Sequence, residues 1–433
     1  MSQTTAVPAA SPAPRGRLDS LDVFRGITIA GMILVNNPGS WRAIYKPLGH
    51  APWDGCTPTD LVFPFFLFIV GVAMTFSFRK RLTGPADRGR LYAQIARRTL
   101  SLFLLGLIMY GFPNWRLMAP YILGIVGLSL FFQDRPAGSP GRFRPVMIVG
   151  AGILVGAILF FAFDFAYFQE KALRVPGVLQ RIAVCYCCTA VILLTTGLRG
   201  RVAWVLGILV AYWVIALHVP APQGYTAKLE GSPGLLHNWV DEQVLGNHLY
   251  GARPDPEGIL STLPAIATVL LGVLVGHWLQ SERERGEKAA GMFFAGVLAI
   301  GLGLLMDKGF PINKKIWSSS YVVYTGGLAC CSLAICYWLI DIHGIRRWAW
   351  PFRVFGTNAI VVYFASSIGA RLLTQIRWPV EAGEITLKGW VYKHWFLSWT
   401  DGKFASMAFA LSYVTLWLLL MIPLYWRRIF VKI

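Results

Sequence analysis

About a dozen apolar stretches run through the chain, each close to the roughly 20 residues that an α-helix needs to cross a bilayer. They lie near residues 19–37, 58–78, 96–112, 117–133, 144–164, 176–197, 202–219, 258–280, 289–306, 320–341, 354–374 and 404–425. A mean hydropathy of +0.54 with only 14% charged residues is not that of a soluble globular protein. We therefore predict an all-α fold, a polytopic integral membrane bundle of about 12 transmembrane helices.

The basic residues fall mainly in alternate loops, for example in 79–98, 135–144, 283–288 and 346–353. Loops rich in Lys and Arg face the cytoplasm, so we expect both termini there as well. The formal charge of +19 could suggest nucleic acid. Because the basic residues are spread over short loops and form no single face, we expect a lipid bilayer and no nucleic acid as the partner.

Two segments outside the spans can be interpreted from their composition, the first 17 residues and the loop 220–257. Residues 1–17 are rich in Ala, Pro, Ser and Thr and lack the apolar core of a signal peptide, so we expect a disordered cytoplasmic lead. Residues 18–433 then form one transmembrane domain. Within it, 220–257 is too polar and too rich in Gly and Pro to span, which predicts an external cap loop with one short helix around 236–244.

The loop between the first two spans, residues 38–57, is polar and aromatic and lies on the external side in this topology. It contains His50, whose side chain titrates near neutral pH and suits acid–base chemistry. A surface histidine without function is the alternative. Cys56 in the same loop fits a small filler better than a nucleophile, because nothing nearby specifies a thiolate.

Ionisable residues within spans are costly unless they are paired or face a cavity. Asp22 and Arg25 are one turn apart, so they form either a self-neutralising pair or a contact for an anion that enters from the cytoplasm. Asp60 could cap its helix, orient a histidine or bind a substrate amine. Arg181 has no acidic neighbour in its own span and needs an anion or a carboxylate from another helix. Together these residues indicate a polar cavity.

The sequence contains no motif for a metal site, a nucleotide-binding site or a serine hydrolase site. His218, His237 and His248 lack metal-ligand spacing, so we expect no metal. There is no phosphate-binding glycine loop, dinucleotide fingerprint or nucleophile elbow. From the residues alone the chain is a membrane protein with a polar interior, either an enzyme or a transporter.

Several segments resemble a known family. They are VNNPGSW, LGHAPWDGCTPTDLVFPFFLFIVG, RVPGVLQRIAVCY, DPEGILSTLPAIATVLLG, PINKKIWSSSYVVYTGG and FGTNAIVVY. In this order they resemble the heparan-α-glucosaminide N-acetyltransferase family of transmembrane acyltransferases, as a bacterial member. The resemblance implies a multi-pass protein of the bacterial cytoplasmic (inner) membrane. It also implies transfer of an acetyl group from cytoplasmic acetyl-CoA to the amino group of a glucosamine-type sugar or glycan acceptor on the periplasmic side.

The resemblance carries two catalytic assignments. The family's active-site histidine falls on His50, in HAPWDG, where it would act as general base or accept the acetyl group itself. The family's asparagine in the VN motif falls on Asn36, which could hold the thioester carbonyl or its oxyanion.

The remaining site assignments rest on physical grounds. We expect Arg25 and Arg181 to bind the CoA phosphates. Asp54, Asp60 and Glu257 are candidates for binding the acceptor amine.

The chain departs from the family pattern by a two-helix insertion at residues 114–173. We expect this insertion to leave the orientation of later spans unchanged and to alter lateral packing or a homo-oligomer interface.

Two rival functions stay open. One is a transporter of N-acetylglucosamine or a related amino sugar, and the other is an O-acyltransferase of a cell-envelope glycan.

Overall fold

The computed structural model describes residues 18–82, 88–132, 143–222, 235–251, 254–380 and 383–431. The predicted lead, residues 1–17, and part of the predicted cap lie outside them. The longer helices are α1 (Asp19–Asn36), α2 (Pro58–Leu82), α3 (Arg88–Gly111), α4 (Trp115–Phe131), α5 (Phe143–Phe163), α7 (Val178–Thr195), α8 (Leu198–His218), α10 (Thr262–Leu279), α11 (Arg285–Met306), α12 (Ser319–Tyr337), α14 (Ala359–Gln375) and α16 (Gly402–Trp426). The shorter elements are η1 (Lys46–Leu48), α6 (Phe165–Glu170), α9 (Leu236–Leu245), η2 (Trp338–Ile342), α13 (Trp350–Thr357), β1 (Arg377–Val380), β2 (Gly383–Thr386), α15 (Leu387–Val391) and η3 (Tyr392–Phe396).

Each predicted span corresponds to a helix, and the chain is an all-α polytopic membrane protein. Within the described ranges, nine helices are long and apolar enough to cross a membrane, and α4 and α14 are shorter apolar helices. The helix α1 carries three charged residues, Asp19, Asp22 and Arg25. The count of twelve spans and the cytoplasmic termini stay predictions.

Backbone contact between α2 and α10 forms the centre of the bundle. A Cβ atom on Gly71 would lie 1.9 Å from the carbonyl oxygen of Val269, and one on Gly272 would lie 2.0 Å from that of Phe68. Small residues at such crossings allow membrane helices to approach closely, which maximises van der Waals contact where the hydrophobic effect no longer drives association. Both helices are therefore largely covered by protein.

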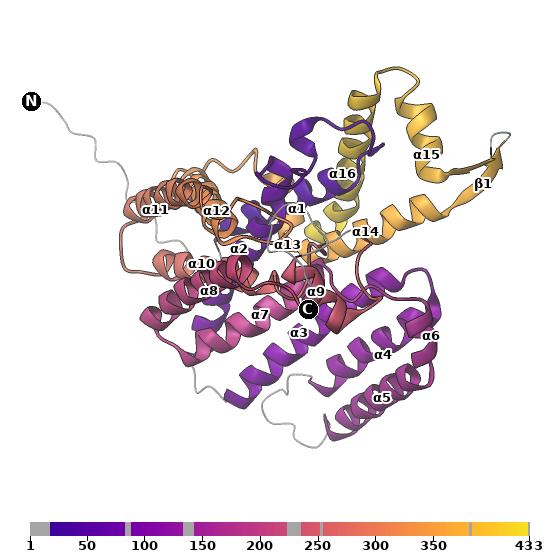
Figure 1. Cartoon of the computed structure of the whole chain (residues 1–433), viewed down its shortest axis with the longest axis horizontal. Coiled ribbons are helices and arrows are strands. Elements are labelled where there is room, and N and C mark those ends of the chain that lie inside the picture. The colour runs from indigo at the N-terminus through magenta and orange to yellow at the C-terminus, as the bar shows by residue number, and fades with distance from the viewer. Residues whose placement is uncertain are drawn as a thin grey trace, which may run out of the picture.

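The helices of the predicted insertion lie at one edge of the bundle (Figure 1). The helix α4 packs against α3 and α5, while α5 packs mainly against α4. Along α5 the apolar side chains point outward, with Ile148 70%, Ile158 67% and Phe163 90% exposed. Such an apolar surface is favourable in contact with lipid, whereas its exposure to water would be too unfavourable in free energy.

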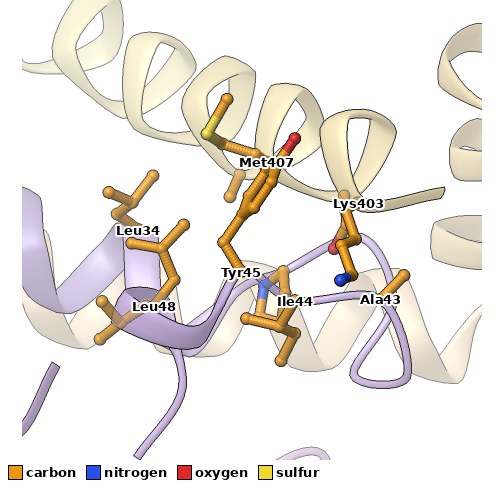
Figure 2. A pocket seen from close by; sticks show the side chains of 11 residues that line it. Leu34, Ala43, Ile44, Tyr45, Leu48, Lys403 and Met407 are labelled. Atoms are coloured by element: carbon orange, nitrogen blue, oxygen red, sulfur yellow. The ribbon is translucent and has the colours of Figure 1, made fainter. Parts of the chain in front are cut away.

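The loop after α1 is fastened to α16, although more than 360 residues separate them. The amide of Gly39 donates to the carbonyl of Ser406 (3.1 Å), and the amide of Ser40 donates to the Ser406 hydroxyl (3.0 Å). Tyr45 lies against Met407 of α16 (Figure 2), and the remaining hollow there is only about 10 Å³. Because that is room for about one water, the contact is a packed anchor and not a ligand site.

Two details extend the sequence prediction. The short helix expected around residues 236–244 is confirmed as α9 (Leu236–Leu245). A two-stranded antiparallel hairpin, β1 with β2, was not predicted and projects beside α15 (Figure 1).

The α2–α10 contact predicts a matched pair of stability effects. Gly71→Ala should lower the free energy of unfolding by about 1–3 kcal/mol, because the new methyl group overlaps the α10 backbone. Gly207→Ala in α8, where a Cβ meets nothing within 4 Å, should be neutral or stabilise by up to about 1 kcal/mol. Thermal unfolding of both variants in detergent measures the difference, and equal melting temperatures would show that the two backbones are not in contact.

Candidate functional site

A histidine and a buried carboxylate meet where α2 begins. The His50 Nδ1 atom lies 2.7 Å from the Asp60 Oδ1 atom, and the side chains are 46% and 1% exposed. The other carboxylate oxygen, Oδ2, accepts hydrogen bonds from the amides of Ala51 and Thr57, both at 3.0 Å. Of the three roles left open for Asp60, two therefore have a direct contact: it caps the start of α2 through the Thr57 amide, and it orients His50.

A lysine completes this group. The Lys314 Nζ atom lies 2.9 Å from His50 Nδ1, 3.4 Å from His50 Nε2 and 3.4 Å from Asp60 Oδ1. Burial lowers the pKa of Lys314, and the carboxylates of Asp60 and Glu257 offset part of that effect. We refer to His50, Asp60 and Lys314 as the histidine site.

The loop after α11 brings Lys314 to the histidine, and several hydrogen bonds hold the two loops together. The amide of Gly55 donates to the carbonyl of Ile312 (2.7 Å), and Asn313 Nδ2 donates to Asp54 Oδ1 (3.1 Å). Lys315 Nζ donates to the carbonyl of Pro52 (2.7 Å). Asp54, a predicted substrate ligand, is thus engaged in holding the loops together.

Asp60 favours one tautomer of the histidine, whereas a hydrogen bond from Lys314 Nζ to Nδ1, 2.9 Å away, would favour the other. A neutral imidazole with its proton on Nδ1 donates to Asp60 and leaves the Nε2 lone pair free. A carboxylate behind a histidine fixes tautomer and ring orientation in the same way in serine hydrolases. With nearly half of the His50 side chain exposed, Nε2 can act as a base or as a nucleophile on a bound substrate.

A second charged group lies at the same end of the bundle. Arg174 is paired with Asp255 and with Glu257, each at 2.7 Å, and all three side chains are at most 15% exposed. Glu257, a predicted substrate ligand, is also close enough to Lys314 to raise its pKa. Asp255 and Glu257 thus connect the loop before α10 with the histidine site.

Asn36 lies at a distance from these contacts, at the end of α1. Its side chain is exposed and lines a cavity of about 210 Å³ together with Arg371 and Lys388. Among the described residues, the hydrogen bonds of the histidine site do not include it. Its catalytic role stays a prediction from the resemblance.

The two arginines assigned to CoA phosphates lie at opposite ends of the bundle. Arg181 stacks on Trp317 at 5.1 Å, and Trp317 in turn contacts Phe63 in the first turns of α2, near His50. Arg25 pairs with Asp22 at 3.1 Å, which is one of the two alternatives left open for it, and lies about three turns of α1 away from Asn36. One phosphate group therefore cannot contact both.

Arg181 is 2% exposed, and its partners are neutral. It donates to the carbonyl of Gly258 (3.0 Å) and to the hydroxyl of Ser261 (2.5 Å). In the part of the chain that the structure describes, no carboxylate lies within ion-pair distance of it. The predicted carboxylate from another helix is thus replaced by a carbonyl, a hydroxyl and an aromatic face.

Cys56 does not fit the role of a nucleophile. Burial, together with the Asp60 charge, raises the pKa of the Cys56 thiol to about 12, so the thiol stays protonated near neutral pH. All seven cysteines are free. A search of the described residues finds no group of three or more His, Cys, Asp or Glu side chains that could hold a metal ion.

The far end of α1 borders a larger cavity of about 400 Å³. Three arginines line it, Arg346, Arg347 and Arg353, together with Trp350. Asp19 pairs with two of them, Arg346 at 3.7 Å and Arg353 at 3.3 Å, so the lining keeps a net positive charge. We call this the arginine cavity, and its residue types suit phosphate groups and a flat ring.

Comparisons with known proteins bear on this arrangement. A family model for "Heparan-alpha-glucosaminide N-acetyltransferase, catalytic" matches residues 17–112, a range that contains His50 and Asp60. The heparan-alpha-glucosaminide N-acetyltransferase of Homo sapiens is 28% identical over 403 residues, which cover 81% of this chain and 53% of the human protein. The Mus musculus protein of the same name is 27% identical over 382 residues, with the same coverage.

The chain is thus similar to the heparan-α-glucosaminide N-acetyltransferase family over most of its length, and this similarity supports the family predicted from the sequence motifs. The chain spans about half the length of the curated relatives it matches.

Sequence reasoning did not single out three of the residues that shape this end of the bundle. Lys314, Arg174 and Arg371 were not assigned a role. A signal existed for Lys314, because PINKK puts two lysines directly before an uncharged span. Arg174 and Arg371 gave no local signal, since their partners come from distant loops.

The helix α9 supports the loop that carries Asp255 and Glu257. Its Asp241 Oδ1 atom accepts from the amide of Ile259 (2.8 Å), and its His237 Nε2 atom lies 2.6 Å from the Tyr212 hydroxyl. Burial raises the pKa of Asp241 to about 6 and lowers that of His237 to about 4.

These two shifts predict opposing effects of pH on stability. A raised carboxyl pKa means that the folded state binds more protons than the unfolded state, so Asp241 stabilises less as pH rises from about 4 to about 6. A lowered histidine pKa has the opposite sign, so His237 stabilises more as pH rises from about 4 to about 6.5.

Asp241→Asn should therefore gain stability relative to the unmodified protein as pH rises from about 4 to about 6. The amide can still accept from Ile259 but does not ionise. Melting temperatures of both proteins at several pH values give the difference. A difference that does not change with pH would contradict the raised pKa.

Proposed function

We propose that this protein transfers an acetyl group from acetyl-CoA to the amino group of a glucosamine-type sugar, and that His50 carries out the proton transfer. The family name of the curated relatives supports the reaction class. The observation that supports the role of His50 most is its Nδ1 contact with the buried Asp60 carboxylate, which leaves Nε2 directed away as an acceptor. The donor side is cytoplasmic and the acceptor side is periplasmic in this proposal.

The chemistry follows from that tautomer. His50 Nε2 removes a proton from the sugar amine while the amine nitrogen bonds to the acetyl carbonyl carbon. As the carbon–sulfur bond breaks, the same proton passes from His50 to the departing sulfur, so protons and electron pairs balance. Asp60 stabilises the imidazolium formed between the two steps. In the two-step variant, Nε2 itself bonds to the acetyl carbon and the CoA sulfur leaves as a thiolate. The sugar amine then displaces the imidazole from the acetyl carbon, and the amine proton passes to the thiolate.

Lys314 and Asn36 are suited to stabilise the negative charge that develops on the acetyl carbonyl oxygen during the reaction. The Lys314 ammonium lies 3.4 Å from Nε2, where a carbonyl oxygen in reaction with the histidine would gain charge. Asn36 is assigned the same function through the resemblance, and its exposed amide is accessible to a ligand. Glu257, which is already paired with Arg174, stays a proposed contact for the acceptor amine.

The arginine cavity is our candidate site for the phosphates of the donor. It lies at the opposite end of α1 from Asn36, and the Asp19 and Val23 side chains of α1 form part of its wall. Arg25 belongs to the same half of α1, so of the two predicted phosphate ligands it is the one near this cavity. An acetyl-bearing arm would then extend through the bundle toward His50.

The first prediction concerns the histidine. With purified protein, labelled acetyl-CoA and glucosamine, His50→Ala should abolish transfer of label to the sugar, and Asp60→Asn should reduce kcat by about 10²–10⁴ through loss of the required tautomer. Both variants should keep the increase in melting temperature caused by CoA. His394→Ala, which removes another exposed histidine, is the matched control and should transfer normally.

Transfer by His50→Ala at a near-normal rate would refute the catalytic assignment. A protein that binds labelled sugar and neither binds nor consumes acetyl-CoA would instead be a transporter. Label on an added hydroxyl acceptor and not on the amine would indicate O-acylation.

The second prediction concerns the donor. Arg347→Ala should raise the KM for acetyl-CoA about tenfold and change kcat little, because an Arg–phosphate contact contributes to binding throughout the reaction. Arg427→Ala at the exposed end of α16 removes the same charge outside the cavity and should leave KM unchanged. Equal KM values for the two variants would exclude the arginine cavity as the donor site.

A further inference from the structure

Lys314 reaches the histidine site from a closed turn, residues 313–318, which directly precedes α12. The amide of Ser318 donates to the carbonyl of Asn313, and the amide of Asn313 donates to the Ser318 hydroxyl, both at 3.0 Å. Within the turn, the amide of Trp317 donates to the carbonyl of Lys314 at 3.1 Å. Lys314 and Trp317 therefore belong to one hydrogen-bonded unit, and the position of one affects the position of the other.

The backbone of Trp317 has a conformation that few bulky residues adopt. Its φ is +55°, in the left-handed region that sterically favours glycine. A bulky residue in this region costs free energy, and the conformation persists only where the surrounding structure imposes it. Such residues are concentrated at functional sites, so the contacts that hold Trp317 indicate what the strain is for.

The indole ring of Trp317 is packed among three helices. The residue is 1% exposed, and its Nε1 atom donates to the Thr268 hydroxyl of α10 at 3.1 Å. Its ring meets the Phe63 ring of α2 edge-on, with 5.3 Å between the ring centres. It meets the Tyr321 ring of α12 in the same way at 5.2 Å. Contacts with α2, α10 and α12 together determine where the ring lies.

Arg181 of α7 contacts the same ring. Its guanidinium carbon lies 5.1 Å from the ring centre, within the range of a cation–π interaction. Its Nη2 atom donates to Gly258 and Ser261, while Nε and Nη1 are buried and have no hydrogen-bond partner among the described residues. A desolvated cation gains more from an aromatic face than an exposed one does, so the contact between Arg181 and Trp317 is a strong one.

The rings around Trp317 are also attached to Asp60. The Tyr321 hydroxyl donates to the backbone carbonyl of Asp60 at 2.5 Å. Phe63 lies three residues after Asp60 and so is its neighbour on the surface of α2. The Lys314 side chain, from the same turn as Trp317, is 18% exposed and pairs with the Asp60 carboxylate at 3.4 Å. The packing of Trp317 thus holds the turn against the residue with which Lys314 pairs.

We propose that Trp317 is a positioning residue that keeps the Lys314 ammonium in the histidine site. Arg181 and Thr268 hold its indole ring, and the 313–318 turn transmits that position to the lysine. Arg181, at the opposite end of the bundle from the arginine cavity, thereby has a role other than phosphate binding. The use of Lys314 in catalysis rests on the proposed function, whereas its placement by Trp317 does not.

The test follows the Lys314 amine in the full chain and needs no acetyl transfer. Burial lowers the pKa of Lys314, whose ammonium faces Asp60, Glu257, Cys56 and His50. Trace amounts of acetic anhydride label only the unprotonated form of an amine. The pH at which labelling of Lys314 is half-maximal, measured by mass spectrometry of its peptide, therefore reports this pKa. We call it the labelling midpoint.

Trp317→Leu removes the ring that fixes the turn, so Lys314 should gain contact with water and its labelling midpoint should shift to higher pH. Thr268→Val conserves size but removes the acceptor of the indole N–H group, and it should shift the midpoint in the same direction. This variant decides the question if Trp317→Leu does not fold. Trp317→Phe keeps an aromatic face for Arg181 and should shift the midpoint less.

Trp278→Leu is the matched control. Trp278 makes the same two kinds of contact, because its Nε1 atom donates to the carbonyl of Lys288 (3.0 Å) and the Arg283 guanidinium faces its ring at 4.8 Å. It lies about three turns of α10 away from Thr268. Loss of this ring should leave the labelling midpoint of Lys314 unchanged.

The acetyl-transfer assay gives a second measurement. Trp317→Leu should lower kcat by about 10–10²-fold and change the KM of either substrate little, because a displaced lysine no longer stabilises the transition state. Lys314→Met should also lower kcat, and the double variant should be no slower than Lys314→Met alone. A residue that only stabilises the bundle would instead give losses that multiply.

An unchanged labelling midpoint in both Trp317→Leu and Thr268→Val would overturn the inference, and so would multiplied losses in the double variant. Absence of transfer by the unmodified protein would refute the proposed function. The labelling midpoints would then still decide whether Trp317 positions Lys314.

Discussion

The buried carboxylate of Asp60 is the group on which the His50 end of the molecule depends. It is 1% exposed, and it can remain there only because donors surround it. The amides of Ala51 and Thr57, the His50 imidazole and the Lys314 ammonium supply them. If any of these donors is removed, part of the free-energy cost of burying the carboxylate is no longer offset. The conformations of the loops that carry His50 and Lys314 and the orientation of the histidine are therefore determined together.

Two groups of charged residues lie toward opposite ends of α1. At one end are the histidine site, the Arg174 pairs and the cavity beside Asn36. At the other end lies the arginine cavity, bordered by Asp19. Close backbone packing at Gly71 and Gly272 holds the helices between them. Such an arrangement suits the proposed reaction, which would recognise a phosphate-bearing donor at one end and a sugar acceptor at the other.

Much of this architecture was predictable from the sequence, because span length and hydrophobicity are local properties. All predicted spans are helical, α9 was expected, and the Asp22–Arg25 pair follows from helical spacing. His50 was identified from HAPWDG by resemblance. Its partnership with Asp60 was one of three options until the fold brought them to 2.7 Å.

Tertiary contacts account for what the sequence did not reveal. Lys314 reaches His50 across 264 positions of the chain, and Arg371 meets Tyr110 across 261. Arg25 and Arg181 were both assigned to the CoA phosphates because of their charge. Their helices place them at opposite ends of the bundle. Residue type indicates what a side chain can bind, but only the packing of helices tells which side chains share a ligand.

The most direct test of the account uses proteoliposomes that enclose labelled acetyl-CoA, with glucosamine in the outer solution. The account predicts that labelled N-acetylglucosamine forms outside, that unmodified protein is required, and that His50→Ala forms none. Passage of intact sugar across the membrane without acetylation, or formation of labelled product by His50→Ala, would contradict it.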